Sequence, residues 1–287
     1  MNEASRWRLA LGRQIGMAYA ANPKARVVMV AGSTGRGTAD RYSDLEIDVY
    51  WSAPPTDEER RAAAEGSGGT LIDLWPYEED EWAEEISFGG FHVGTSTFLV
   101  ETMERYLTEV LDGNSIEPLA QIRLFSLLHA HTIAGEDLVM RWRNKASAYP
   151  GELSRAMLRA NLPFEGLGYA EDMLIDRDDL LVLNDLICRV ERQVLGVLLG
   201  LNRLYLPNPR FKGMHELIAE MRLKPRDLSA RLKAVFRLPP REGMLELHAI
   251  CEDTLTLVDE HMPELDTTEY RENLRRRRGV WDSLPHF

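Results

Sequence analysis

The stretch Val27–Trp51, VVMVAGSTGRGTADRYSDLEIDVYW, decides the fold of this chain. It begins with a short apolar run, Val27–Val30, which is rich in β-branched residues and is followed two residues later by a glycine. Such a run predicts a buried strand rather than a helix. A second predicted strand carries Asp44, Glu46 and Asp48 at alternate positions. Because side chains alternate across a strand, the three carboxylates are expected to share one face.

A row of carboxylates is costly to bury unless cations or hydrogen bonds meet it. Hard divalent cations prefer oxygen ligands, so the row indicates a metal site; the alternative is the solvent face of an edge strand. The glycine-rich segment 32–37 does not suit a dinucleotide fingerprint, because too few residues follow it to form a crossover helix. The sequence also contains no GxxxxGK[ST] phosphate loop.

The pairing of Gly32-Ser33 with Ser43-Asp44-Leu45-Glu46 resembles the signature of the DNA polymerase β-type nucleotidyltransferases. The version with glutamate in second place is most similar to kanamycin and related antibiotic nucleotidyltransferases, and the resemblance is specific only over residues 27–51. It implies that Asp44 and Glu46 bind Mg²⁺ and that Gly32 and Ser33 cradle the phosphates of a nucleoside triphosphate, with ATP expected. A hydroxyl of a small-molecule acceptor would then attack the α-phosphate and expel pyrophosphate.

The resemblance also implies a third metal-binding carboxylate on a neighbouring strand, which is predicted here at residues 91–97. The matching triplet reads Val93-Gly94-Thr95, so a glycine stands where the acid is expected. Three explanations stay open. In the first, Asp73 on the predicted strand 70–75 is the third metal ligand. In the second, Asp48 is that ligand, although alternate strand positions advance about 6.6–6.8 Å each and carry it away from Asp44. In the third, the site has only two acids and its turnover is weakened or absent.

The order of the predicted elements indicates an α+β protein. A mixed β-sheet flanked by helices is expected in residues 1–112, and an all-α helical bundle domain in residues 113–287, which is also the arrangement of the family. Residues 78–85 are acidic and predict a loop or short helix, whereas residues 115–132 have helical periodicity. The longest predicted helix, Asp178–Tyr205, is apolar almost all round and is expected at the centre of the bundle.

Candidates outside the signature come from the helical domain and from the glycine-rich turn. The resemblance implies a general base on a helix glutamate, and Glu165 is favoured over Glu171 and Asp172 because its surroundings are apolar. Lys212 and Arg41 are candidates for contact with the triphosphate. For Glu165, Lys212 and Arg41 alike, the alternative is an ordinary solvated charge.

The charge and composition of the chain indicate which kinds of partner and which cellular compartment to expect. A formal charge of −12 over 287 residues argues against a broad nucleic-acid surface, which needs a basic face, and suits a cationic, aminoglycoside-like acceptor. Neither a signal peptide nor a membrane span is expected, and the two cysteines are expected to be reduced, so a cytoplasmic protein is predicted.

Three further expectations concern the tail, the assembly and the alternative function. Arg275–Arg278 suits a solvated helix end, and Trp281 and Phe287 are expected to pack back on the body. By analogy with the antibiotic enzymes a homodimer is expected. The alternative to an active enzyme is a catalytically degraded relative that binds a nucleotide or a partner.

Overall fold

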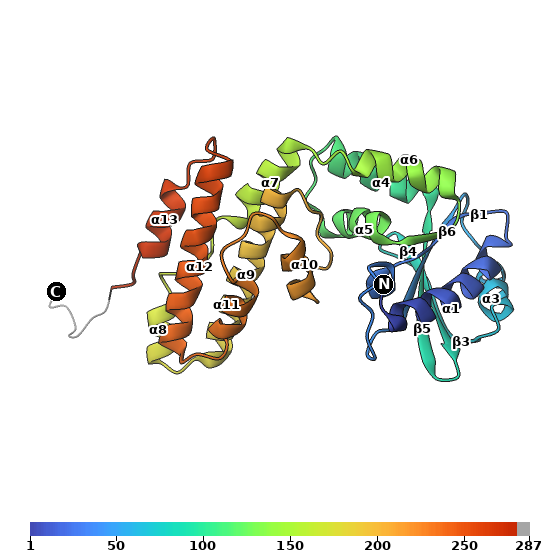
Figure 1. Ribbon diagram of the computed structural model, residues 1–287, viewed down its shortest axis with the longest axis horizontal. Coiled ribbons are helices and arrows are strands. Elements are labelled where there is room, and N and C mark those ends of the chain that lie inside the picture. Colours follow the sequence, from blue (N-terminus) through green and yellow to red (C-terminus); the bar gives the residue numbers. More distant parts are fainter. Residues whose placement is uncertain (280–287) are drawn as a thin grey trace, which may run out of the picture. The chain divides into compact units, whose positions relative to one another are not determined.

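The computed structural model describes residues 1–279, which form two compact units (Figure 1). The first unit is Met1–Tyr149 and the second begins at Pro150. The sequence placed a boundary at residues 112 and 113, whereas in the structure residues 113–149 belong with the sheet, because a strand within them pairs with it. The predicted packing of Trp281 and Phe287 lies outside the described residues.

The first unit is built on a six-stranded mixed sheet with the strand order β3-β4-β5-β2-β1-β6. Strands β2 and β5 are parallel, and every other neighbouring pair is antiparallel. The predicted α+β class is therefore confirmed. The strands are β1 (Ala25–Val30), β2 (Leu45–Trp51), β3 (Thr70–Glu78), β4 (Glu81–Phe88), β5 (Phe91–Leu99) and β6 (His131–Ala134).

One face of the sheet packs on helices α1 (Glu3–Ala20) and α3 (Asp57–Gly66) (Figure 1). The odd-numbered residues of β2 lie on this face, together with apolar residues of β1, β4 and β5. Helix α3 begins with a capping box, in which the Thr56 side chain accepts from Glu59 N and the Glu59 side chain accepts from Thr56 N. The core is made by Ile15, Tyr19, Val28, Val30, Leu45, Ile47, Val49, Trp51, Ala63, Ala64, Ile86 and Val93.

The even-numbered residues of β2 point to the opposite face, which α4 (Val100–Leu111), α5 (Pro118–His129) and α6 (Glu136–Ala146) cover. The Tyr50 ring stacks on Phe98, with centroids 5.2 Å apart, and meets the Trp142 ring edge-on at 5.3 Å. Asp48 is buried on this face, but Glu46, two residues earlier, is exposed. The carboxylate row of β2 therefore begins in solvent and ends under helices.

Two strands differ from the sequence prediction. The prediction of a loop or short helix for residues 78–85 was wrong, because Gly89 and Gly90, both with positive φ, close a tight hairpin that pairs β4 with β5. The predicted helix over residues 115–132 ends at His129. The following segment extends instead, and β6 pairs with β1.

The second unit consists of helices joined by turns. Its helix α9 has 23 residues and is largely buried, as predicted for the centre of a bundle. Residues 164–170, which include the Glu165 expected on a helix, form turns in which Gly166 and Gly168 have positive φ. Within residues 1–279, no helix has the length and apolar character needed to cross a bilayer. The helices are α7 (Gly151–Asn161), α8 (Glu171–Asp176), α9 (Leu180–Asn202), α10 (Met214–Glu220), α11 (Leu228–Val235), α12 (Pro240–His261) and α13 (Thr268–Arg275).

Candidate metal and nucleotide site

The Glu46 carboxylate lies against the backbone of the glycine-rich turn that follows β1. After β1 the chain forms a single helical turn, α2 (Gly32–Gly35), and Gly32 has a φ of +59°. A Cβ atom on Gly32 would lie 1.6 Å from Glu46 Oε2. The N–H groups in the first turn of a helix have no acceptor within that helix. The carboxylate and a set of backbone donors therefore meet at one place.

Asp44 immediately precedes β2, and its side chain is exposed, like that of Glu46. The loop before it is fixed, because Arg8 Nη2 donates to Ser43 O at 2.7 Å. Asp40 accepts from Tyr42 N at 2.9 Å and from Ser43 Oγ at 3.0 Å, and these hydrogen bonds hold the pKa of Asp40 below its usual value. Asp44 and Glu46 are thus exposed residues held on an ordered loop and strand.

Asp48 is held in a different environment. It is 3% exposed, accepts from Ser126 Oγ at 2.8 Å, and lies 3.7 Å from Arg123 Nη1. Burial raises the pKa of Asp48, although Arg123 opposes this rise. Because α5 engages this carboxylate, the explanation that gives Asp48 the role of third metal ligand is not supported.

Asp73 is also separated from the site. Its strand, β3, stands at the edge of the sheet, three strands away from β2. At about 4.8 Å per strand this separation is about 14 Å. The Asp73 carboxylate instead accepts from the backbone of Leu74 at 2.8 Å. Asp73 therefore cannot share an ion with Asp44 and Glu46 in this sheet.

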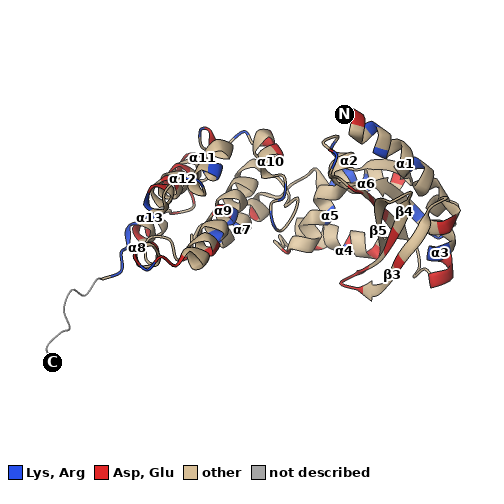
Figure 2. Ribbon diagram, turned by 90° about the horizontal axis from the view of Figure 1, so that it is seen from below, with Lys and Arg blue, Asp and Glu red and all other residues tan. Residues whose placement is uncertain are grey.

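The position beside Glu46 belongs to Gly94, as the sequence match predicted. Gly94 pairs with Glu46 on β2 and with Glu85 on β4, so both glutamates lie on the same face and flank the glycine. A Cβ on Gly94 would meet nothing within 4 Å. The sequence did not predict that Glu85 lies beside Gly94, because β4 was not predicted; the glycine pair before β5 was the available signal. Figure 2 shows acidic residues along strands of this sheet.

The donors at this place suit a hard divalent cation. Asp44 and Glu46 supply carboxylate oxygens, and Mg²⁺ characteristically combines one or two carboxylates with phosphate oxygens and water. Across residues 1–279, no three His, Cys, Asp or Glu side chains are gathered around one point as a ready metal cage.

The remaining predicted residues lie on the surface. Arg41 is exposed and stacks over the Tyr42 ring, 4.6 Å from its centroid. Glu165 is exposed in the turns between α7 and α8, and Lys212 is exposed just before α10. Glu165 and Lys212 belong to the second unit, so their roles in a site on the first unit stay predictions.

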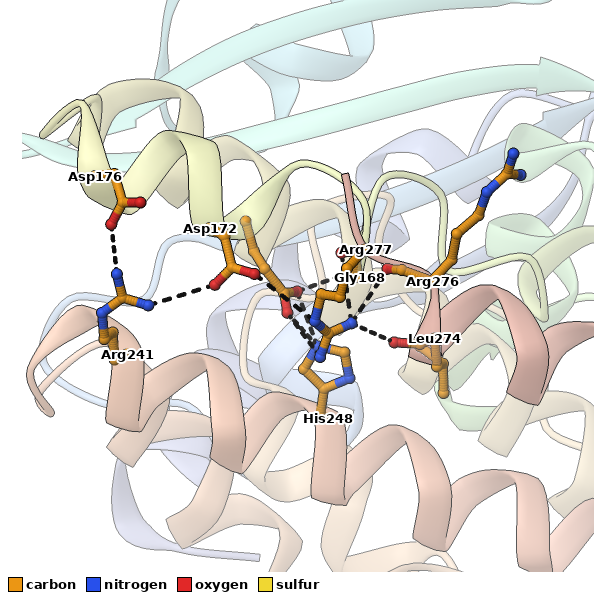
Figure 3. Close-up of polar contacts among 9 residues, drawn as sticks. Gly168, Asp172, Asp176, Arg241, His248, Leu274, Arg276 and Arg277 are labelled. Carbon is orange, nitrogen blue, oxygen red and sulfur yellow. Dashed lines mark hydrogen bonds and ion pairs between the residues drawn. The ribbon is translucent and has the colours of Figure 1, made fainter. Parts of the chain in front are cut away.

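Glu171, an alternative to Glu165, is engaged within the second unit by groups of Gly168, His248 and Arg277, three residues that Figure 3 labels. Its carboxylate accepts from Gly168 N and from His248 Nε2, each at 2.8 Å, and lies 3.4 Å from Arg277 Nη2. Burial acts to raise the pKa of Glu171, but the hydrogen bond and charge of His248, the Gly168 N–H group and the Arg277 charge together outweigh burial, and the pKa is lowered. Asp172 likewise pairs with Arg241 at 3.4 Å. Both carboxylates are therefore paired within the second unit.

Comparison with known proteins adds little. No protein-family model matches the chain, and no curated protein matches it. One solved structure, a nucleotidyltransferase-like protein from Exiguobacterium sibiricum 255-15, is similar over 93% of this chain and 86% of that chain, with 11% identity and a TM-score of 0.37. A likeness of this size shows no family, so we infer function from the side chains.

Proposed function

We propose that this protein is a magnesium-dependent nucleotidyltransferase. It would transfer a nucleoside monophosphate from a triphosphate, with ATP expected, to a hydroxyl of a small molecule such as an aminoglycoside-like antibiotic, with release of pyrophosphate. The observation that carries the proposal is the close contact between the Glu46 carboxylate and the backbone of Gly32, with Asp44 two residues earlier in the sequence.

Each part of the site has a role in this chemistry. A bound Mg²⁺ would neutralise charge on the triphosphate and orient it for in-line attack. Asp44 and Glu46 would hold the ion from a rigid strand. The Ser33 hydroxyl and the first amides of α2 would donate to the β- and γ-phosphates. Gly32 lacks a side chain, so the phosphates can approach the backbone closely.

The remaining roles are proposals that follow from the sequence. Glu165 would take the proton from the attacking hydroxyl, and Arg41 and Lys212 would contact the triphosphate. A formal charge of −12 favours a cationic acceptor over a nucleic acid. The protein would act in the cytoplasm, and it would form a homodimer.

One observation favours a second candidate function. Gly94, beside Glu46, offers no carboxylate to a metal ion. If phosphoryl chemistry requires a third acid there, the protein is a catalytically degraded relative that binds a nucleotide or a partner through the same site.

Pyrophosphate release separates the two functions. The assay would combine the full chain with ATP, Mg²⁺ and a panel of aminoglycosides, and would compare the wild type with Asp44→Ala. Asp73→Asn is the matched control, because it removes a carboxylate from the same sheet three strands away. Release that Asp44→Ala abolishes and Asp73→Asn retains supports the enzyme. An equal, near-zero signal in all three proteins favours the second candidate.

A further inference from the structure

We propose that the four arginines Arg275–Arg278, called the strap below, hold the turn at residues 164–170 closed by charge, and that multivalent phosphate anions release them. Arg275 is the last residue of α13, and the next three arginines follow the helix. The strap and the turn both belong to the second unit, so their contact is a feature separate from the site at Asp44 and Glu46.

Gly168 lets the end of α13 come very close to the turn. A Cβ atom on Gly168 would lie 2.6 Å from Leu274 O and 3.0 Å from Arg276 O. A side chain at this position would therefore push the two segments apart, and the φ of +84° also favours glycine. The backbones of the turn and of the strap thus fit directly against each other.

The Arg277 guanidinium joins the strap to the turn (Figure 3). Its Nη1 atom donates to Gly168 O at 3.4 Å and to Leu274 O at 2.9 Å. Its Nη2 atom lies 3.4 Å from Glu171 Oε1, and its Nε atom lies 3.7 Å from Asp172 Oδ2. Glu171 also accepts from Gly168 N, so one carboxylate binds both the turn and the strap.

The other three arginines attach the strap to an aromatic ring and to α12. The guanidinium carbons of Arg276 and Arg278 lie 6.0 and 5.6 Å from the centroid of the Tyr169 ring, within the range of cation–π attraction. Arg275 Nη2 lies 3.8 Å from Glu252 Oε1 on α12. Each arginine of the strap therefore has a partner within the second unit.

These attachments depend on charge, because apolar burial ends at Leu274. Leu274 is 2% exposed, whereas residues 275–279 are all exposed. The side chains of Arg277 and Asp172 are 46% and 49% exposed, and ion pairs in such positions are weak and are screened by salt. The strap can therefore open without disturbing the apolar core of the unit.

Multivalent phosphate anions are the ligands that suit the arginines of an open strap. A guanidinium group matches two phosphate oxygens at once. Four consecutive arginines offer several such groups to one anion, so a polyphosphate gains from multivalent binding in a way that chloride cannot. Such an anion would compete with the separate carboxylates of Glu171, Asp172 and Glu252.

Hydrogen exchange of the full chain, followed by mass spectrometry of peptides that cover residues 164–174, tests the inference. The wild type is compared with Arg277→Ala and with the matched control Arg226→Ala, whose arginine is 94% exposed and pairs with the adjacent Asp227. We expect exchange about 10-fold faster in Arg277→Ala, because a charge-assisted hydrogen bond is lost, and unchanged exchange in Arg226→Ala.

Sodium tripolyphosphate is the probe for release. It should speed exchange of the same peptides in the wild type, whereas sodium chloride at equal ionic strength should have a much smaller effect. Equal exchange in the wild type and Arg277→Ala would overturn the strap. Equal effects of tripolyphosphate and sodium chloride would overturn its release by phosphate.

The turn also carries Glu165, so one consequence rests on the proposed function. In the pyrophosphate assay, Arg277→Ala should lower kcat and leave KM for ATP unchanged, because the proposed base is no longer held in place. Arg277→Lys keeps the charge and should restore part of kcat and part of the protection. Absence of turnover in the wild type would overturn the proposed function and leave the exchange result standing.

Discussion

At position 32 any side chain would have to displace the Glu46 carboxylate, because a Cβ would lie 1.6 Å from Oε2 and the φ of +59° disfavours non-glycine residues. We expect Gly32→Ala to cost about 1–3 kcal/mol of stability and to weaken Mn²⁺ binding. Urea unfolding and titration with Mn²⁺, a spectroscopically visible substitute for Mg²⁺, measure the two effects.

Gly66→Ala is the control for this substitution, since its Cβ would meet nothing within 4 Å and its backbone needs no positive φ. It should leave both quantities nearly unchanged. If Gly32→Ala bound Mn²⁺ with wild-type affinity, the result would contradict a metal site that depends on the close contact between the Glu46 carboxylate and the turn.

The buried carboxyl group of Glu191 should make the free energy of unfolding depend on pH. It is 6% exposed, its Oε1 atom has no hydrogen-bond partner, and burial raises its pKa to about 8. In the unfolded chain a glutamate titrates near pH 4.3. Between these values the unfolded state loses a proton that the folded state keeps, so stability falls as the pH rises, by up to about 1.4 kcal/mol per pH unit, and levels off above pH 8.

Glu191→Gln should remove this dependence. The variant should match the wild type near pH 4 and exceed its stability near pH 8, in urea unfolding followed by circular dichroism. Glu260→Gln, at an exposed position of α12, is the control and should follow the wild-type curve. A wild-type slope that persists in Glu191→Gln would assign the pH dependence to other groups.

At the scale of elements, Arg60 fixes α3 to the β3–β4 hairpin. Its buried guanidinium pairs with Glu84 and donates to the carbonyl groups of Trp75 and Ala83 at 2.8 and 2.7 Å. Arg60→Leu leaves Glu84 buried without its cation, so we expect a loss of about 3–5 kcal/mol. The exposed neighbour Arg61 provides the control, and Arg61→Leu should stay within about 0.5 kcal/mol of the wild type. Equal urea midpoints for the two variants would refute the bracing role of Arg60.

The same contact explains what the sequence could and could not predict. Strands β1, β2 and β5 and the start of α3 follow from local apolar patterns and a capping box, and Asp44, Glu46 and Gly32 follow from their spacing. β4 was missed because Glu84 and Glu85 read locally as a solvated segment. Glu84 can be buried because Arg60, on helix α3, places a cation beside it. The position of Glu85 beside Gly94 likewise follows only from the pairing of the strands.

At the scale of the molecule, the extent of the first unit can be tested by truncation. Residues 113–149 supply β6 and the helices that cover Asp48 and Tyr50. We expect a fragment of residues 1–149 to unfold cooperatively and to bind Mn²⁺ like the full chain. A fragment of residues 1–112, which matches the boundary inferred from sequence, should fail to fold. Cooperative folding of the shorter fragment would show that the covering helices are dispensable.

The central claim is a divalent metal and nucleotide site at Asp44 and Glu46, and thermal unfolding of the full chain tests it most directly. ATP, GTP, CTP and UTP would each be added with and without Mg²⁺ to the wild type, Asp44→Ala and Asp73→Asn. A ligand at about 100 times its dissociation constant stabilises a protein by about 2.7 kcal/mol. We predict a rise in Tm that requires Mg²⁺, disappears in Asp44→Ala and persists in Asp73→Asn. No rise with any triphosphate, or an equal rise in Asp44→Ala, would contradict the account.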